Sequence, residues 1–263
     1  AVGVVQAGYP LAAIFTGFAV AALEPVYGWQ HLLLAAGVIS AVMLPIAAAV
    51  LPEKEAGSAK AHLSAGQAIA ALFGPGLRLR SLFLWAATFT GLMVLYFITS
   101  WITKLSVQAG LSETNSIYAG ALYNGGAFTG TMLMSLLSAR VSLTKLVPLL
   151  LIAAAGLMLW FGSVPMSVGV TLGVAFLIGV TLQGGYNGIW PIAAGAYPAS
   201  NRATGIGWAV SIGRGGAILG PIMGGYLMDA KVPLPLLFGV YCVPLLACAA
   251  AAFLVGTQAG KTA

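Results

Sequence analysis

Long uninterrupted apolar runs recur along this chain of 263 residues, and they constrain its fold more than any other feature. Only 6% of the residues are charged and 60% are hydrophobic, and the mean hydropathy is +1.00. A soluble domain needs a charged surface, whereas a helix of about 20 apolar residues crosses the hydrocarbon core of a bilayer. Transmembrane β-strands would instead alternate apolar and polar residues. The sequence therefore predicts an all-α membrane protein.

We predict eight membrane spans, at residues 1–23, 31–50, 81–103, 114–138, 143–162, 166–190, 203–229 and 234–255. One long charged connection, residues 51–80, separates the first two spans from the last six. Within it, Ser64 and Gln67 fit a capping box, which predicts a short helix over residues 64–73 at the membrane surface. A plain tether is the alternative reading of this loop.

These spans divide the chain into residues 1–50, a central loop 51–80, a six-helix unit 81–255 and a tail 256–263. Residue 1 already lies in an apolar run and no initiator Met precedes it. We therefore expect that N-terminal helices are missing, and that the chain is the later part of a protein built from six plus six spans.

Lysine and arginine residues near the span ends predict the orientation, because cytoplasmic loops carry an excess of both. When the central loop is placed in the cytoplasm, Lys104 and Lys231 lie on the opposite side. The cytoplasmic side then holds Lys54, Lys60, Arg78, Arg80, Arg140, Lys145, Arg202 and Lys261. We therefore expect both ends of the chain in the cytoplasm.

Several other classes of function lack a sequence signal. The basic residues are scattered singly and form no stripe for nucleic acid. Cys242 and Cys248 fall on different turns of one apolar run, so neither a disulfide nor a metal site is expected. Residues 256–262 (GTQAGKT) have three residues between the glycines where a phosphate-binding loop has four, and residues 209–213 (AVSIG) lack the first Gly of a nucleophile elbow. We expect neither an enzyme nor a cofactor.

Arg214 is the most informative residue for function. It follows Arg202, at the expected cytoplasmic entry of the seventh span, by a helical rise of about 18 Å, which places it near the bilayer midplane. An arginine at that depth costs roughly 2.5–3.5 kcal/mol by insertion scales and normally faces a cavity or a partner. Its planar fork of donors matches a carboxylate, so we predict a substrate clamp. The alternative is a structural arginine bound to backbone carbonyls or to a buried acid.

The seventh span also carries a glycine face. Gly216, Gly220 and Gly224 repeat every four residues, which favours close contact between helices, and Pro221 favours a kink. A moving transporter helix and a tightly packed static helix explain this pattern equally well.

The sixth span carries a polar and aromatic stripe. Its members recur at helical spacing on one face, where they would meet water, substrate or another polar helix: Gln183, Tyr186, Asn187 and Trp190. Aromatic rings beside amide groups suit a small ring-bearing ligand. Trp190 could instead anchor the span at the interface. Tyr96 and Asn124 are weaker candidates for the same cavity, with hydrogen bonding between helices as the alternative.

Around the seventh span the chain carries the segments 197–198 (YP), 202–208 (RATGIGW), 213–221 (GRGGAILGP) and 224–225 (GG). In these segments it resembles the aromatic acid:proton symporter family of the major facilitator superfamily. The resemblance extends upstream through 8–10 (GYP), 27–29 (YGW), 51–53 (LPE) and 125–126 (GG), and so covers nearly the whole chain.

The resemblance implies a fold of twelve spans in two six-helix bundles, of which this chain would hold spans five to twelve. It also implies alternating access, symport of a small aromatic carboxylate with a proton, and a place in a bacterial inner membrane. Arg202 and Arg214 match arginines of functional importance in the family. Arg140 is expected at the cytoplasmic gate, although this loop reads Ser138-Ala139-Arg140 where the family usually carries an Asp-Arg pair.

The leading hypothesis is therefore a proton-coupled transporter that takes up a small organic anion such as a hydroxybenzoate. Its partners would be that anion, a proton, the lipid bilayer and the N-terminal helices of the same protein. Glu24, Glu113 and Asp229 all lie at span ends, so this chain shows no clear proton-coupling carboxylate. The alternatives are a transporter of the same superfamily for another metabolite, such as a sugar acid or an exported drug, and a membrane-embedded enzyme or scaffold.

Overall fold

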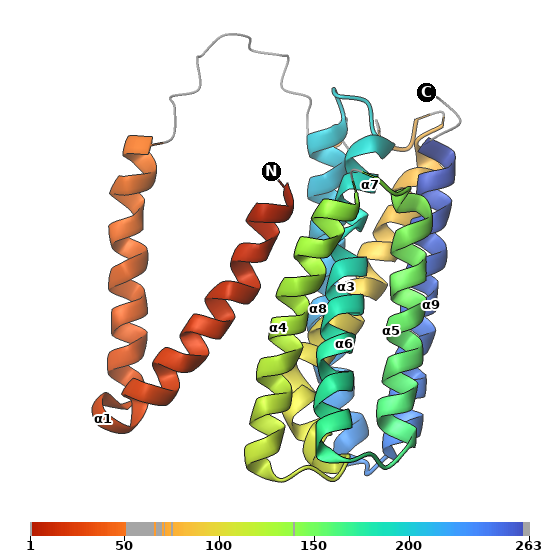
Figure 1. The fold of residues 1–263 in the computed structure, drawn as a ribbon. Coiled ribbons are helices and arrows are strands. Elements are labelled where there is room, and N and C mark those ends of the chain that lie inside the picture. Colours follow the sequence, from red (N-terminus) through yellow and green to blue (C-terminus); the bar gives the residue numbers. More distant parts are fainter. Residues whose placement is uncertain are drawn as a thin grey trace.

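The computed structural model describes residues 2–50, 66, 70, 72–74, 76–138 and 140–259. All of the regular elements within these residues are helices, which confirms the predicted all-α class (Figure 1). They are α1 (Val2–Val50), α3 (Arg78–Gln108), α4 (Glu113–Leu137), α5 (Leu143–Ser163), α6 (Val168–Asn187), α7 (Ile189–Ala196), α8 (Arg202–Asp229) and α9 (Leu234–Ala259).

Six stretches of the described residues are long and apolar enough to cross a membrane. They are the second part of α1 (Val26–Ala49), α3, α5, α6 together with α7, α8 and α9. The predicted count of eight is therefore not confirmed, because α4 and the first part of α1 are not among the six. Glycines and polar residues such as Asn124 lower the hydropathy of α4, yet this helix packs against α6 inside the bundle.

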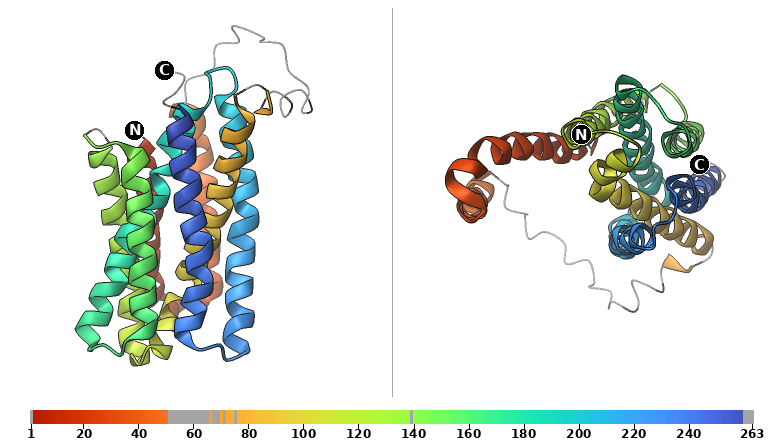
Figure 2. Two further views of the ribbon diagram at one scale, coloured as in Figure 1. Left: turned by 90° about the vertical axis from the view of Figure 1, so that its right-hand side faces the viewer. Right: turned by 90° about the horizontal axis from the view of Figure 1, so that it is seen from below.

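Helix α1 changes direction sharply at Gly28. This residue has φ 73° and ψ 159°, a conformation that glycine adopts without the steric cost of a side chain. The break separates the two spans predicted at residues 1–23 and 31–50. The first part of α1 approaches α4, and the second part stands apart from the other helices with side chains such as Leu44 exposed (Figure 2).

The predicted surface helix at residues 64–73 lies largely outside the described residues. Within it, Gly66, Ala70 and Leu72 are helical, and Leu72 is fully buried. Helix α3 begins at Arg78, three residues before the predicted start of the third span. Helix α9 continues to Ala259, beyond the start of the tail predicted at residues 256–263.

Two helix pairs pack through glycine. In the α3–α8 pair, a Cβ on Gly216 or Gly220 would clash with the backbone of Phe89 or Met93. In the α4–α6 pair, Gly126, Gly130 and Gly179 likewise meet the backbone of the partner helix. Glycine at these positions lets the two backbones approach more closely than any side chain would permit.

A cluster of hydrogen bonds joins three helices at the end of the bundle where α3 begins. Arg80 donates to the carbonyl oxygens of Ala196 (3.2 Å) and Gln258 (2.7 Å), and thereby ties α3 to the ends of α7 and α9. Nearby, Tyr197 donates to Ser81 Oγ at 3.0 Å, and Ser81 donates to the carbonyl oxygen of Leu72 at 3.0 Å. These bonds fix the start of α3, whose middle section lines the cavity described next, to the ends of α7 and α9.

Candidate functional site

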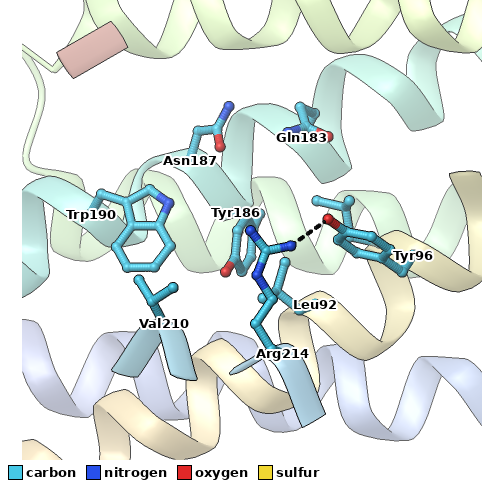
Figure 3. Close-up of a pocket in the computed structure, with 9 residues that line it drawn as sticks. Leu92, Tyr96, Gln183, Tyr186, Asn187, Trp190, Val210 and Arg214 are labelled. Carbon is cyan, nitrogen blue, oxygen red and sulfur yellow. Dashed lines mark hydrogen bonds between the residues drawn. The ribbon is translucent and has the colours of Figure 1, made fainter. Parts of the chain in front are cut away.

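A cavity of about 200 Å³ lies among α3, α6, α7 and α8 (Figure 3). It is lined by Leu92, Leu95, Tyr96, Gln183, Tyr186, Asn187, Trp190, Val210 and Arg214. Its size falls below the 300–1,000 Å³ that is typical of pockets for drug-sized ligands, so it suits a small molecule.

Arg214 brings the positive charge of the cavity. It lies in the middle of α8, and its side chain is exposed towards the cavity rather than enclosed by helix packing. Its Nη1 donates a hydrogen bond to the Tyr96 hydroxyl at 2.9 Å (Figure 3). Among the residues that the structure describes, no carboxylate pairs with the guanidinium, so its remaining donors can reach an anion.

The stripe predicted on the sixth span lines the cavity as a unit. Gln183, Tyr186 and Asn187 come from the last turns of α6, and Trp190 comes from the first turn of α7 after a break at Gly188. The Tyr186 and Trp190 rings meet edge to face, with centroids 5.9 Å apart.

A hydrogen bond to a neighbouring helix holds the Asn187 side chain in place. Its Nδ2 donates to Thr131 Oγ1 of α4 at 2.9 Å, and the Thr131 hydroxyl in turn donates to the carbonyl oxygen of Ala127. The amide therefore joins the cavity wall to α4, so its orientation does not depend on a ligand.

Three predicted residues lie away from the cavity. Asn124, predicted to bind substrate, is not part of its lining, and its Nδ2 donates to the carbonyl oxygen of Gly120 in its own helix. Within a membrane helix, such a local bond satisfies an amide without a ligand. Arg202 is exposed at the start of α8, and Arg140 is exposed in the turn between α4 and α5. Both lie at the end of the bundle where the predicted gate would be.

The residues predicted for helix packing face α3 and α9. Gly216 and Gly220 lie against α3, and a Cβ on Gly224 would come within 2.6 Å of the Phe97 ring. Pro221 lies inside α8, and its carbonyl oxygen accepts a hydrogen bond from Trp101 Nε1 at 3.0 Å.

Sequence reasoning missed three apolar lining residues, Leu92, Leu95 and Val210. Leucines occur on every face of a membrane helix, so composition cannot distinguish a cavity wall from a lipid-facing surface. Spacing carried a signal, however. Leu92 precedes Tyr96 by four residues and Val210 precedes Arg214 by four, which places each pair on one helix face.

Comparison with known proteins places the chain in a family. The family model described as Major Facilitator Superfamily matches residues 1–195. The gallate transporter of Pseudomonas putida is 28% identical over 93% of this chain and 61% of its own length. The 4-hydroxybenzoate transporter PcaK of Pseudomonas aeruginosa is 28% identical over 84% of this chain and 56% of its own length.

A third relative has the same degree of similarity. The 3-(3-hydroxy-phenyl)propionate transporter of Escherichia coli K12 is 28% identical over 87% of this chain and 56% of its own length. The chain thus spans about three fifths of the length of the curated relatives that it matches. Because the family model covers most of the chain, and the helices that could cross a membrane enclose a cavity with a central arginine, the chain belongs to the major facilitator superfamily of membrane transporters.

Proposed function

We propose that the protein takes up a small organic anion, an aromatic carboxylate such as a hydroxybenzoate, together with protons and by alternating access. The observation that carries this proposal is Arg214, a permanent cation in the middle of α8 that lines a cavity and pairs with no described carboxylate. A carboxylate would satisfy the free donors of its guanidinium fork.

The shape and lining of the cavity support an aromatic ligand. Tyr96, Tyr186 and Trp190 supply ring surfaces, and Leu92 and Val210 supply apolar walls. A volume of about 200 Å³ accommodates a single ring. The relatives named above as gallate and hydroxybenzoate transporters agree with this ligand class.

Within this proposal, residues 81–255 form the C-terminal bundle and residues 1–50 contribute two helices to an N-terminal bundle. The substrate site of such transporters lies between the two bundles, near the bilayer midplane. The protein lies in a bacterial inner membrane, with both ends of this chain in the cytoplasm and Arg140 and Arg202 at the cytoplasmic gate. Proton coupling rests on the family resemblance, since Glu113 and Asp229, the acids with described side chains, lie at helix ends.

The test is uptake of labelled 4-hydroxybenzoate into membrane vesicles that contain the full-length protein. An imposed inward proton gradient should drive uptake, and a protonophore should abolish it. Arg214→Ala should reduce uptake at least tenfold, because Arg214 is the only cation among the described residues that line the cavity. Arg214→Lys should recover part of the loss, since lysine keeps the charge without the planar fork.

Lys145→Ala is the matched control, because Lys145 is an exposed cation at the start of α5, away from the cavity. Its uptake should equal that of the unsubstituted protein. Full uptake in the Arg214→Ala variant, at normal abundance in the membrane, would contradict the carboxylate clamp.

A further inference from the structure

The cavity contains a buried hydrogen-bond donor that the protein leaves without a partner, the hydroxyl group of Tyr186. The side chain is only 3% exposed, and within the described structure its oxygen has no hydrogen-bond partner. Native proteins seldom keep a buried hydroxyl unsatisfied without a reason. Because Tyr186 also lines the cavity, a ligand is the natural source of the missing partner.

Packing holds the Tyr186 ring in one position. A Cβ on Gly91 of α3 would come within 2.8 Å of this ring and within 2.9 Å of Cys248 Sγ, so the ring fits a space that only glycine leaves. Trp190 closes another side through its edge-to-face contact. The packing therefore holds the hydroxyl in the wall of the cavity, at a position where no described protein group accepts its proton.

The position of Tyr186 relative to Arg214 indicates which part of a ligand it meets. Both residues line the same cavity. Figure 3 shows Arg214 reaching from α8 into the space between the side chains of Tyr186 and Tyr96. The Tyr96 hydroxyl accepts from Arg214, so its own proton can be donated elsewhere.

We propose that Tyr186 is a second donor of the carboxylate site, so that the anion is held by the Arg214 guanidinium and the Tyr186 hydroxyl together. This inference rests on the proposed function and assigns a direct ligand contact to a residue on the helix opposite Arg214. One carboxylate oxygen accepts from the guanidinium, and the other accepts from the phenol. Binding thereby links α6 to α8 across the cavity through the ligand.

The chemistry separates this proposal from a different use of the same hydroxyl. If Tyr186 bound a ring hydroxyl of the ligand, removing the Tyr186 hydroxyl would lower the affinity for hydroxylated rings alone. If it binds the carboxylate, its removal weakens every aromatic carboxylate to the same degree. The proposal therefore predicts equal losses for benzoate and 4-hydroxybenzoate.

The experiment measures the affinity of the purified full-length protein for benzoate, 4-hydroxybenzoate and the neutral amide benzamide. Tyr186→Phe should weaken both carboxylates roughly three- to tenfold, the effect of one hydrogen bond, and leave weak benzamide binding unchanged. Its thermal stability should be equal or higher, because the variant keeps the ring and removes only an unpaired group.

Tyr241→Phe is the matched control, because the Tyr241 hydroxyl already donates to the carbonyl oxygen of Gly220. This variant should lose stability and keep the affinity for both carboxylates. Unchanged affinities in Tyr186→Phe, or a loss confined to 4-hydroxybenzoate, would overturn the inference while leaving the Arg214 clamp intact. If the unsubstituted protein bound neither carboxylate, the proposed function itself would fail.

Discussion

Tyr96 controls the direction in which Arg214 points. A guanidinium group on a long side chain has several rotamers, and the hydrogen bond from Nη1 to the Tyr96 hydroxyl selects one of them. The bond joins α3 to α8 at the level of the cavity, so the charge is already in place before a ligand arrives. Such preorganisation reduces the entropy that binding must overcome.

We expect Tyr96→Phe to weaken binding of 4-hydroxybenzoate roughly threefold to tenfold, because the guanidinium then loses its fixed orientation. A rise in KM for uptake, with nearly unchanged abundance in the membrane, is the measurement. Tyr118→Phe serves as the control, since Tyr118 is exposed on α4 and does not line the cavity. An equal effect of the two substitutions would show that the contact with Arg214 does not matter.

The sequence identified the charged and aromatic part of this cavity, because an arginine deep in an apolar run and a polar stripe at helical spacing both stand out. It did not identify the hydrogen bonds of Arg80, whose acceptors are backbone carbonyls and so leave no pattern of residue types. Asn124 does not line this cavity, and composition cannot show that its amide bonds within its own helix.

At the level of the helices, glycine determines which pairs lie in close contact. The spacing of Gly216, Gly220 and Gly224 predicted one such face, and the structure pairs it with α3. The equivalent contact between α4 and α6 was less visible, because Gly126, Gly130 and Gly179 lie on two separate helices. Only the folded chain shows which of the 35 glycines meet a neighbouring backbone.

Adjacent glycines in α4 provide a direct test. A Cβ on Gly126 would clash with the backbone of α6 at Phe176, whereas a Cβ on Gly125 meets nothing within 4 Å. We expect Gly126→Ala to lower the thermal stability of the detergent-solubilised protein markedly. Gly125→Ala should leave it unchanged or raise it slightly, because alanine favours a helix by up to about 1 kcal/mol. Similar melting temperatures for the two variants would contradict the close packing of α4 on α6.

At the level of the whole molecule, the antiparallel helices place the described basic residues mainly at one end. Arg78, Arg80, Arg140, Lys145 and Arg202 all lie where helices α3, α5 and α8 begin or α4 ends. The sequence predicted a span at residues 114–138, where α4 lies, although the polar residues of α4 keep it out of the six stretches that are apolar enough to cross a membrane. It also did not show that the sixth span breaks into α6 and α7 at Gly188.

The two ends of α5 can be used to test the orientation. We expect a cysteine in place of Lys145, an exposed residue near its start, to react with a membrane-impermeant thiol reagent only in inside-out vesicles. A cysteine in place of Val164, which is 48% exposed just beyond its end, should react in intact cells. The native Cys242 and Cys248 are buried and should give little background. The reverse pattern of labelling would refute a cytoplasmic location for both ends of the chain.

The lone guanidinium in the cavity also has a consequence for bioenergetics. On the proposed function, an anion neutralises Arg214, so the loaded carrier changes conformation without moving this charge through the electric field. The empty carrier returns without that anion, so only the group that has released the proton can then balance Arg214. A full unit of unbalanced charge crossing the field is worth about 2.3 kcal/mol per 100 mV. The site that binds the proton therefore determines how strongly the membrane voltage acts on the return of the empty carrier.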